Sequence, residues 1–290
     1  DRKGEDEYLH GIERDVSSYL SEAHGRYQRA IVCREYDEPI DLFDRHLYEK
    51  GALVLHLLRR ELGEEVFWAG LSDYVGAHGQ SNVETSDLKR AMESRSGRSL
   101  DRFFEQWVHR AGHPKVHVRV AMEKKRLTVH FEQKQKDAPY ELTYEIEVKT
   151  KGATERHRLE SADRHAALSL PMPTRPEYVA IDPELRIVGE LQVEAPKEML
   201  RNQLTMGTSP RVRAAAAKLL EKHHDWKTLE ALSKALANTK ETWMERVACA
   251  RALSKLRGER AKAALLAGAR LLMDHYGTDI VDQVRLAGAF

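Results

Sequence analysis

The chain has 290 residues, 41% of them hydrophobic and 32% charged, and its 47 basic and 46 acidic side chains leave a formal net charge of +1. Such balanced charge argues against a nucleic-acid-binding protein, which usually carries a basic stripe. No apolar run approaches the roughly 20 residues that span a bilayer. The length indicates about two domains, with room for three small ones. Cys33 and Cys249 lie too far apart in the sequence to suggest a disulfide framework, so we predict a reducing, cytoplasmic compartment.

The first 46 residues are polar and only partly periodic. Apolar residues recur at helical spacing from Tyr8 to Leu20 and predict one amphipathic helix. The stretch from His24 to Pro39 has few periodic apolar residues and indicates a long connection. Long loops inside compact domains are often functional, although no single residue of this loop can be given a role from its type alone.

Four helical patterns follow, and a Gly112-His113-Pro114 sequence ends them. The first has one apolar face and should stop at Gly63. The third should begin at Thr85-Ser86, where a hydroxyl can accept the unpaired N–H groups of the first turn. The four patterns cover residues 47–62, 67–78, 85–96 and 99–108.

After Pro114 the apolar period changes from helical to alternating. Short runs with one apolar face, separated by turn residues, are typical of a β-sandwich. The clearest run, from Tyr140 to Val148, alternates throughout. The predicted strands cover residues 116–120, 127–131, 140–148, 166–170, 178–181 and 187–193.

A third composition begins after Ala195-Pro196, rich in Ala, Leu, Lys, Arg and Glu, which favour helices. Two Arg-Val pairs, Arg211-Val212 and Arg246-Val247, each lead into a similar Ala- and Leu-containing pattern. Their spacing of about 35 residues suits stacked helical hairpins of the HEAT or armadillo kind. Residues 274–290 should form one more helix followed by an irregular end.

The order of short motifs between residues 41 and 114 is more specific than any one motif. It resembles a zinc aminopeptidase family of the gluzincin type, which includes membrane alanyl aminopeptidase and leukotriene hydrolase. The motifs that carry the resemblance are Tyr48-Glu49-Lys50-Gly51-Ala52, Leu62-Gly63-Glu64, Thr85-Ser86-Asp87-Leu88, the Ser-Gly-Arg-Ser-Leu-Asp-Arg-Phe-Phe-Glu-Gln-Trp-Val run of residues 96–108, and Gly112-His113-Pro114.

This resemblance implies a multidomain α+β protein. Residues 1–114 would be the helical second half of a thermolysin-like catalytic domain, residues 115–194 a small β-sandwich, and residues 195–290 a HEAT- or armadillo-like repeat domain. The family's metal site is a His-Glu-x-x-His helix with a later glutamate, both placed before the Tyr-Glu-Lys-Gly motif. None of the 14 histidines sits in such a motif. We therefore expect the carboxy-terminal portion of a longer enzyme, with Zn²⁺ in the full-length protein and none in this chain.

Tyr48 is the one catalytic position that the resemblance carries over. Peptide hydrolysis on zinc passes through a tetrahedral intermediate with a negative oxygen. A phenolic O–H keeps its proton at neutral pH and can donate to that oxyanion. The simpler alternative is a half-buried tyrosine that closes a helix end, but the motif around it favours the catalytic role.

Other candidates have simpler explanations. Glu49 and Lys50 are expected to be a solvated or supporting pair at a helix start. His109 and His113 have a spacing that can bind metal on a helix, but Gly112 and Pro114 make a continuous helix through both improbable, so both are taken as structural. The adjacent pair at 223–224 is excluded because neighbours on a helix face different directions.

Two hypotheses follow. In the first, the chain is part of a metallo-aminopeptidase that acts on peptide substrates and needs its amino-terminal catalytic half as a partner, so that the chain alone is inactive. In the second, it is a non-catalytic scaffold, because helical solenoids present extended concave surfaces. Neither hypothesis involves nucleic acid or a membrane span. The reading frame upstream of Asp1 would distinguish them, since intact zinc ligands there would favour the enzyme.

Overall fold

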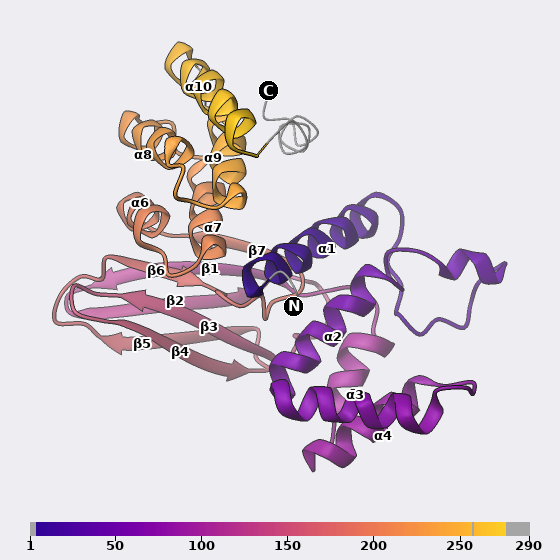
Figure 1. Ribbon diagram of the computed structural model, residues 1–290. Helices are drawn as coiled ribbons and strands as arrows, with labels where there is room; N and C mark the ends of the chain where they lie inside the picture. Colours follow the sequence, from indigo (N-terminus) through magenta and orange to yellow (C-terminus); the bar gives the residue numbers. More distant parts are fainter. Residues whose placement is uncertain (1–3, 257, 277–290) are drawn as a thin grey trace. The chain divides into compact units, whose positions relative to one another are not determined.

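The structure, a computed structural model, describes residues 4–256 and 258–276 and divides into two compact units (Figure 1). The helical unit comprises residues 11–115 and 185–190; the sheet-and-repeat unit comprises the described parts of residues 1–10, 116–184 and 191–290. Among the described helices, none is both long and apolar enough to cross a membrane.

The helical unit contains the segment that positions Tyr48. Its elements are α1 (Glu5–Gly25, from Gly11 onward), the 3₁₀ helix η1 (Pro39–Leu42), α2 (Glu49–Leu62), α3 (Glu64–His78), α4 (Thr85–Ser96), α5 (Asp101–Phe104) and the π-helix η2 (Glu105–His109). These confirm the predicted helices to within a few residues. Gly63 ends α2 at φ 81°, a backbone conformation that favours glycine.

The start of α4 differs in detail from the prediction. Glu84, rather than a hydroxyl of Thr85, occupies the N-cap position. The Asp87 carboxylate accepts a hydrogen bond from the Glu84 backbone N–H at 2.8 Å. The helix begins where it was expected, but a carboxylate in its first turn satisfies the N-terminal backbone.

Two antiparallel sheets follow, with strand orders β5-β2-β1-β7 and β4-β3-β6. The strands are β1 (Lys115–Glu123), β2 (Arg126–Gln133), β3 (Leu142–Lys149), β4 (Thr154–Ser161), β5 (His165–Pro171), β6 (Tyr178–Ile181) and β7 (Glu190–Glu194). Phe131 of β2 stacks on Tyr144 of β3 with ring centroids 4.2 Å apart, so the two sheets share one apolar interior. The strand predicted at 187–193 in fact begins at Glu190.

Strand β4 is absent from the prediction. It lies at the edge of its sheet and pairs along its whole length with β3, from Leu142 opposite Ser161 to Lys149 opposite Thr154. No residue of β4 is fully buried. An edge strand with a polar sequence lacks the alternation of apolar residues by which strands are recognised.

The carboxy-terminal helices pack in two rows (Figure 1). Contacts join α6 to α8 and α8 to α10 in one row and α7 to α9 in the other. Their bounds are α6 (Lys197–Met206), α7 (Pro210–Leu220), α8 (Trp226–Ala237), α9 (Trp243–Lys255) and α10 (Glu259–Tyr276). This is the predicted arrangement of helical hairpins. Most of the helix expected at 274–290 lies outside the described residues.

Small residues let these helices approach closely. Ala216, Ala217 and Ala250 are fully buried in the repeat core. A Cβ atom on Gly268 would lie 2.2 Å from a methyl carbon of Leu236, so α10 and α8 touch at a glycine. Arg213 of α7 forms ion pairs with Glu241 and Glu245.

A buried carboxylate holds the sheet to the segment that precedes α7. Glu147 of β3 is 1% exposed, and it accepts hydrogen bonds from the Tyr178 hydroxyl at 2.8 Å and from the Thr208 hydroxyl at 2.7 Å. Burial, and next the hydrogen bond to Glu147, raise the pKa of Tyr178, so that phenol remains a donor at neutral pH.

We predict that Glu147→Gln lowers the free energy of unfolding by about 1–3 kcal/mol, because the two hydroxyls lose a charged acceptor while the side-chain volume stays the same. Urea denaturation followed by circular dichroism measures the change. The matched control is Glu155→Gln on the neighbouring strand, an exposed position that should change stability little. Equal losses in the two variants would contradict the assignment.

Candidate functional site

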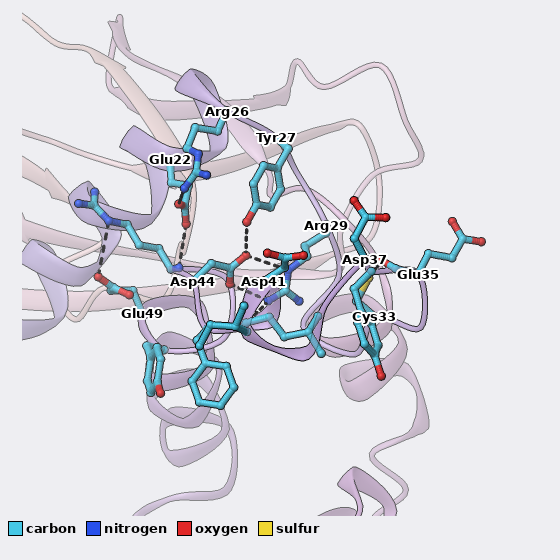
Figure 2. A pocket seen from close by; sticks show the side chains of 16 residues that line it. Glu22, Arg26, Tyr27, Arg29, Cys33, Glu35, Asp37, Asp41, Asp44 and Glu49 are labelled. Carbon is cyan, nitrogen blue, oxygen red and sulfur yellow. Dashed lines mark hydrogen bonds and ion pairs between the residues drawn. The ribbon is translucent and has the colours of Figure 1, made fainter.

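The helical unit contains a pocket of about 1150 Å³ built from the end of α1, the following connection and the start of α2 (Figure 2). The long connection predicted between His24 and Pro39 forms one wall. The residues that line the pocket are Glu22, Arg26, Tyr27, Arg29, Cys33, Glu35, Tyr36, Asp37, Ile40, Asp41, Leu42, Phe43, Asp44, Arg45, Tyr48 and Glu49. Six of these side chains are carboxylates and three are guanidiniums, so the lining is acidic.

Tyr48 stands at the rim of this pocket. It occupies the N-cap position of α2, and its backbone N–H donates to the Asp44 carbonyl at 3.1 Å. The side chain is 57% exposed and lies beside Phe43, with ring centroids 6.2 Å apart. Within the described residues, no hydrogen bond engages its hydroxyl. Tyr48 is therefore held at its backbone, while its side chain is largely exposed at the pocket.

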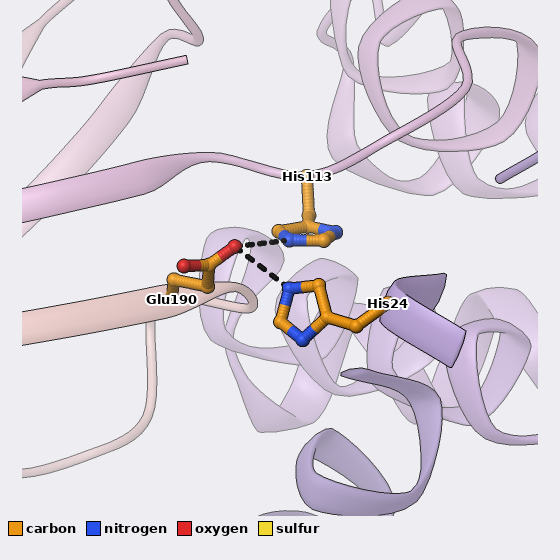
Figure 3. Close-up of side chains that lie close together, drawn as sticks. All are labelled: His24, His113 and Glu190. Atoms are coloured by element: carbon orange, nitrogen blue, oxygen red, sulfur yellow. Dashed lines mark hydrogen bonds and ion pairs between the residues drawn. The ribbon is translucent and has the colours of Figure 1, made fainter. Parts of the chain in front are cut away.

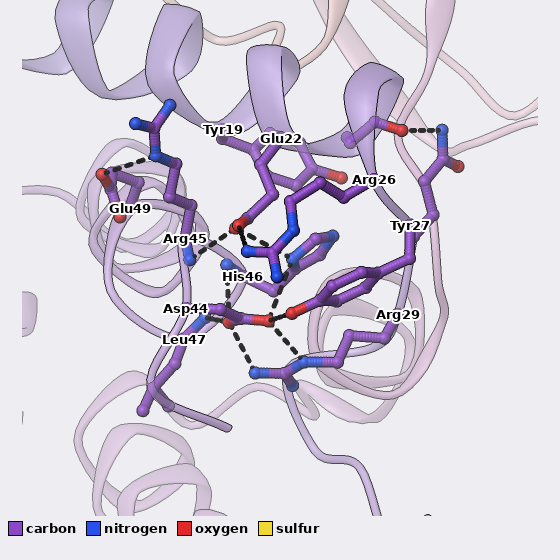
Figure 4. Close-up of polar contacts among 12 residues, drawn as sticks. Tyr19, Glu22, Arg26, Tyr27, Arg29, Asp44, Arg45, His46, Leu47 and Glu49 are labelled. Atoms are coloured by element: carbon purple, nitrogen blue, oxygen red, sulfur yellow. Dashed lines mark hydrogen bonds and ion pairs between the residues drawn. The ribbon is translucent and has the colours of Figure 1, made fainter. Parts of the chain in front are cut away.

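Asp44 fixes the loop that ends at Tyr48 (Figure 4). One carboxylate oxygen accepts from Arg29 at 2.6 Å and from the backbone N–H groups of His46 and Leu47 at 2.9 and 3.0 Å. The other accepts from the Tyr27 hydroxyl at 2.7 Å and from Arg29 at 2.9 Å. Burial alone would raise the pKa of Asp44, but these hydrogen bonds outweigh it and lower the pKa to about 2. The carboxylate is thus ionised and fully engaged at neutral pH.

His46 lies beneath this network and is fully buried. Its ring stacks on Tyr27 at 5.2 Å between centroids and meets the edge of Tyr19 at 5.4 Å. Its Nδ1 is 3.3 Å from Asp44, without the geometry of a hydrogen bond. Burial lowers the pKa of His46 despite the nearby carboxylates, so a neutral imidazole packs under the pocket floor.

Lys50 is a supporting residue, one of the two alternatives that the sequence left open. It is fully buried rather than solvated. Its Nζ donates to the carbonyls of Arg110 and Gly112 at 3.3 and 3.1 Å. Burial, with Arg29 and Arg110 nearby, lowers its pKa to about 8. Lys50 therefore ties the start of α2 to the turn that ends the helical segment, whereas Glu49 faces the pocket.

The residues around Tyr48 do not fit a zinc ion. Glu22, Asp44 and His46 bring ligand atoms within 4.8 Å of one another. However, Glu22 already accepts from the Arg45 backbone N–H at 2.8 Å and pairs with Arg26, and Asp44 is fully engaged. A cation here would have to displace a guanidinium from each carboxylate. The family's metal-binding motif is also absent from the sequence, so no catalytic step can be assigned to zinc held by this cluster.

A second cluster joins His24, His113 and Glu190 (Figure 3). The sequence suggested His109 as the possible metal-binding partner of His113, but the structure groups His113 with His24 and Glu190. His113 Nε2 lies 3.2 Å from Glu190 Oε1, and His24 Nε2 lies 2.9 Å from the same oxygen. Lys115 Nζ is 2.7 Å from that oxygen. Because Glu190 follows His113 by 77 residues, no local motif could have brought these residues together.

Comparisons with known proteins match two parts of the chain. Residues 6–107 match the peptidase family M1 domain, and residues 198–287 match HEAT repeats. The tricorn protease-interacting factor F2 of Thermoplasma volcanium is 37% identical over 98 residues, which are 34% of this chain and 12% of that protein. Aminopeptidase M1 of Arabidopsis thaliana is 34% identical over 115 residues, which are 40% of this chain and 12% of that protein.

A solved structure shows a similar fold over nearly the whole chain. It is Legionella pneumophila aminopeptidase A in complex with aspartic acid, with a TM-score of 0.67 and 14% sequence identity, and the match covers 92% of this chain and 33% of that one. The segment aligned with each of the two relatives named above is only 12% of the relative's own length. The M1 match includes Tyr48 and the whole pocket lining. Residues 6–107 of this chain are therefore similar to the peptidase family M1 domain, and residues 198–287 to HEAT repeats.

Proposed function

We propose that this chain is part of a zinc-dependent metallo-aminopeptidase that removes amino-terminal residues from peptides, and that Tyr48 donates a hydrogen bond to the oxyanion of the tetrahedral intermediate. The observation that carries the proposal is the exposed Tyr48 side chain at the rim of a pocket, within the segment that matches the M1 domain. A tyrosine that merely closed a helix end would be covered by its neighbours.

The position of Tyr48 suits the proposed role. Its backbone is fixed at the start of α2, so the phenol needs little reorganisation to meet a developing negative charge. A phenolic hydroxyl stays protonated at neutral pH, so it can donate a hydrogen bond to an oxyanion. Phe43 beside it limits the directions that the ring can take.

The charge of the pocket supports a peptide amino terminus as the ligand. Glu22, Asp44 and Glu49 each lie within ion-pair distance of an arginine. By contrast, Glu35 and Asp37 form no ion pair within the described part of the chain. Unpaired carboxylates in a pocket attract a cationic group, and the α-amino group of a peptide is such a cation near neutral pH. Zinc would supply polarisation of the scissile carbonyl, and we place its ligands outside these 290 residues.

The first prediction concerns the chain by itself. Purified, untagged chain should release no p-nitroaniline from aminoacyl nitroanilides in a chelator-sensitive manner, even with added zinc, because the family's metal-binding motif is absent from the sequence. Absorbance at the nitroaniline band measures the release. Robust release that a chelator abolishes would contradict our placement of the zinc ligands outside these residues.

A second prediction concerns Tyr48 in protein that carries these residues together with an intact His-Glu-x-x-His motif, expressed from the reading frame that encodes this chain. Tyr48→Phe should lower kcat by about 10²–10³-fold with a small change in KM, because a donor to the transition state is lost. The matched control is Tyr36→Phe, another exposed tyrosine of the same pocket. A Tyr48→Phe enzyme with unchanged kcat would exclude the role. Substituted zinc ligands in that reading frame would instead favour the scaffold hypothesis.

A third prediction tests Asp44 as the residue that positions Tyr48. Asp44→Asn should lower the free energy of unfolding by about 2–4 kcal/mol, because the guanidinium of Arg29, largely buried, loses its charged partner. The folded-state pKa of about 2 lies below the ordinary aspartate pKa of 3.8, so the stabilisation is present above about pH 4 and disappears as the pH falls toward 2.

Urea denaturation at several pH values measures this effect. The difference between wild type and Asp44→Asn should therefore shrink between about pH 4 and pH 2. Asp37→Asn, an exposed carboxylate of the same pocket, serves as the control and should leave stability nearly unchanged. A stability difference that does not depend on pH would show that charge is not what Asp44 contributes.

A further inference from the structure

Three side chains from distant segments of the helical unit converge on one point (Figure 3). His24 comes from the last turn of α1, His113 from the turn that follows η2, and Glu190 from the start of β7. Their ligand atoms lie within 4.8 Å of one another. We propose that His24 Nε2, His113 Nε2 and the Glu190 carboxylate bind a divalent transition-metal ion of the zinc class, which fastens the end of α1 to the two segments it faces.

The distances fit tetrahedral coordination. With metal–ligand bonds of about 2.0–2.1 Å, neighbouring ligand atoms of a tetrahedral zinc site are about 3.3 Å apart. The two histidine nitrogens stand 2.9 and 3.2 Å from Glu190 Oε1. Small rotations of the side chains would admit the ion. Two imidazoles and one carboxylate form a ligand set that prefers zinc and its neighbours to calcium or magnesium.

A further contact orients one of the ligands, as is usual for histidines that bind a metal. The Tyr19 hydroxyl lies 3.1 Å from His113 Nδ1, and Tyr19 is fully buried. This contact leaves Nε2 of His113 as the atom that faces Glu190.

The backbone beneath Glu190 is equally fixed. Its N–H donates to the Pro114 carbonyl at 3.0 Å. A Cβ atom on Gly189 would lie 2.2 Å from that carbonyl oxygen, so only glycine allows the two strands of chain to approach this closely. Consequently the residue next to His113 and the residue next to Glu190 are packed together before any ion binds.

Lys115 would compete with a metal ion for the Glu190 carboxylate. Its ammonium lies 2.7 Å from Glu190 Oε1, and its side chain is 40% exposed. Metal binding would release Lys115 to solvent, and the proton that each histidine Nε2 donates to Glu190 would pass to Nδ1 of the same ring or to solvent. His24 is 48% exposed, so an ion can enter from solvent, and the fourth coordination position is left to water.

The test is titration of untagged chain with Co²⁺ and then Zn²⁺ at pH 7.5, followed by the visible absorption of tetrahedral Co²⁺. One equivalent of Co²⁺ should produce the bands, and Zn²⁺ should abolish them. His24→Ala and Glu190→Gln should each weaken binding by at least about 100-fold, since the loss of a residue that only orients a ligand already costs 10–100-fold. Lys115→Met should bind about three- to tenfold more tightly, because a repelling charge is removed.

Glu194→Gln is the matched control, because Glu194 is also a β7 carboxylate but pairs with a single histidine, His117. It should retain wild-type affinity. His24 and Glu190 are partly exposed, so their variants should fold, which circular dichroism verifies. Absence of tetrahedral bands in the wild type would overturn the proposal, as would bands of undiminished strength in His24→Ala and Glu190→Gln. None of these outcomes depends on Tyr48 or on peptidase activity.

Discussion

The carboxylate of Asp44 is the interaction on which the site depends. It gathers a guanidinium, a phenol and two backbone N–H groups from opposite ends of a connection that has almost no regular structure. A loop of this length loses much conformational entropy when it is ordered, and short-range contacts alone would not keep it in one conformation. Because Asp44 also precedes α2 directly, the same contacts that order the loop set the direction in which the helix begins. The position of Tyr48 is a consequence of that direction.

Two residues of the Tyr-Glu-Lys-Gly motif have opposite environments. Tyr48 is exposed at the pocket, whereas Lys50 is fully buried and donates to the carbonyls of Arg110 and Gly112, in the turn that follows the π-helix η2. Carbonyls at a helix end are orphaned acceptors, and a cation is the favoured partner for them. The motif therefore combines a residue that is exposed at the pocket with a residue that fixes the start of the same helix. The lowered pKa of Lys50, about 8, reflects the cost of burying that ammonium.

Helices and their ends could be predicted because their signals are local. The apolar face of α2 and the glycine that stops it occupy adjacent turns, and Pro210 marks the start of α7 in the same way. Strand β4 was not predicted because backbone hydrogen bonds to β3 hold it in place, and such bonds do not depend on the side-chain types that a sequence pattern records. The sequence could not decide between a solvated and a supporting Lys50 for a related reason: a lysine on a helix is usually solvated, and the carbonyls that Lys50 contacts lie about 60 residues further along the chain. The grouping of His24 with Glu190 spans 166 residues, which no periodicity reaches.

Exposed aromatic and aliphatic side chains gather where the pocket opens. Ile40 is 65% exposed, Phe43 60% and Tyr48 57%. Single exposed apolar residues are ordinary, but several together beside a polar rim indicate a surface that meets a ligand or another polypeptide. Their exposure does not come from a slack loop, because the Asp44 contacts hold the backbone that carries Phe43 and Tyr48. The peptide substrate that we propose would use each property of this rigid, partly apolar, acidic surface: apolar contact for its side chain, negative charge for its amino terminus, and one neutral donor for the oxygen that becomes charged.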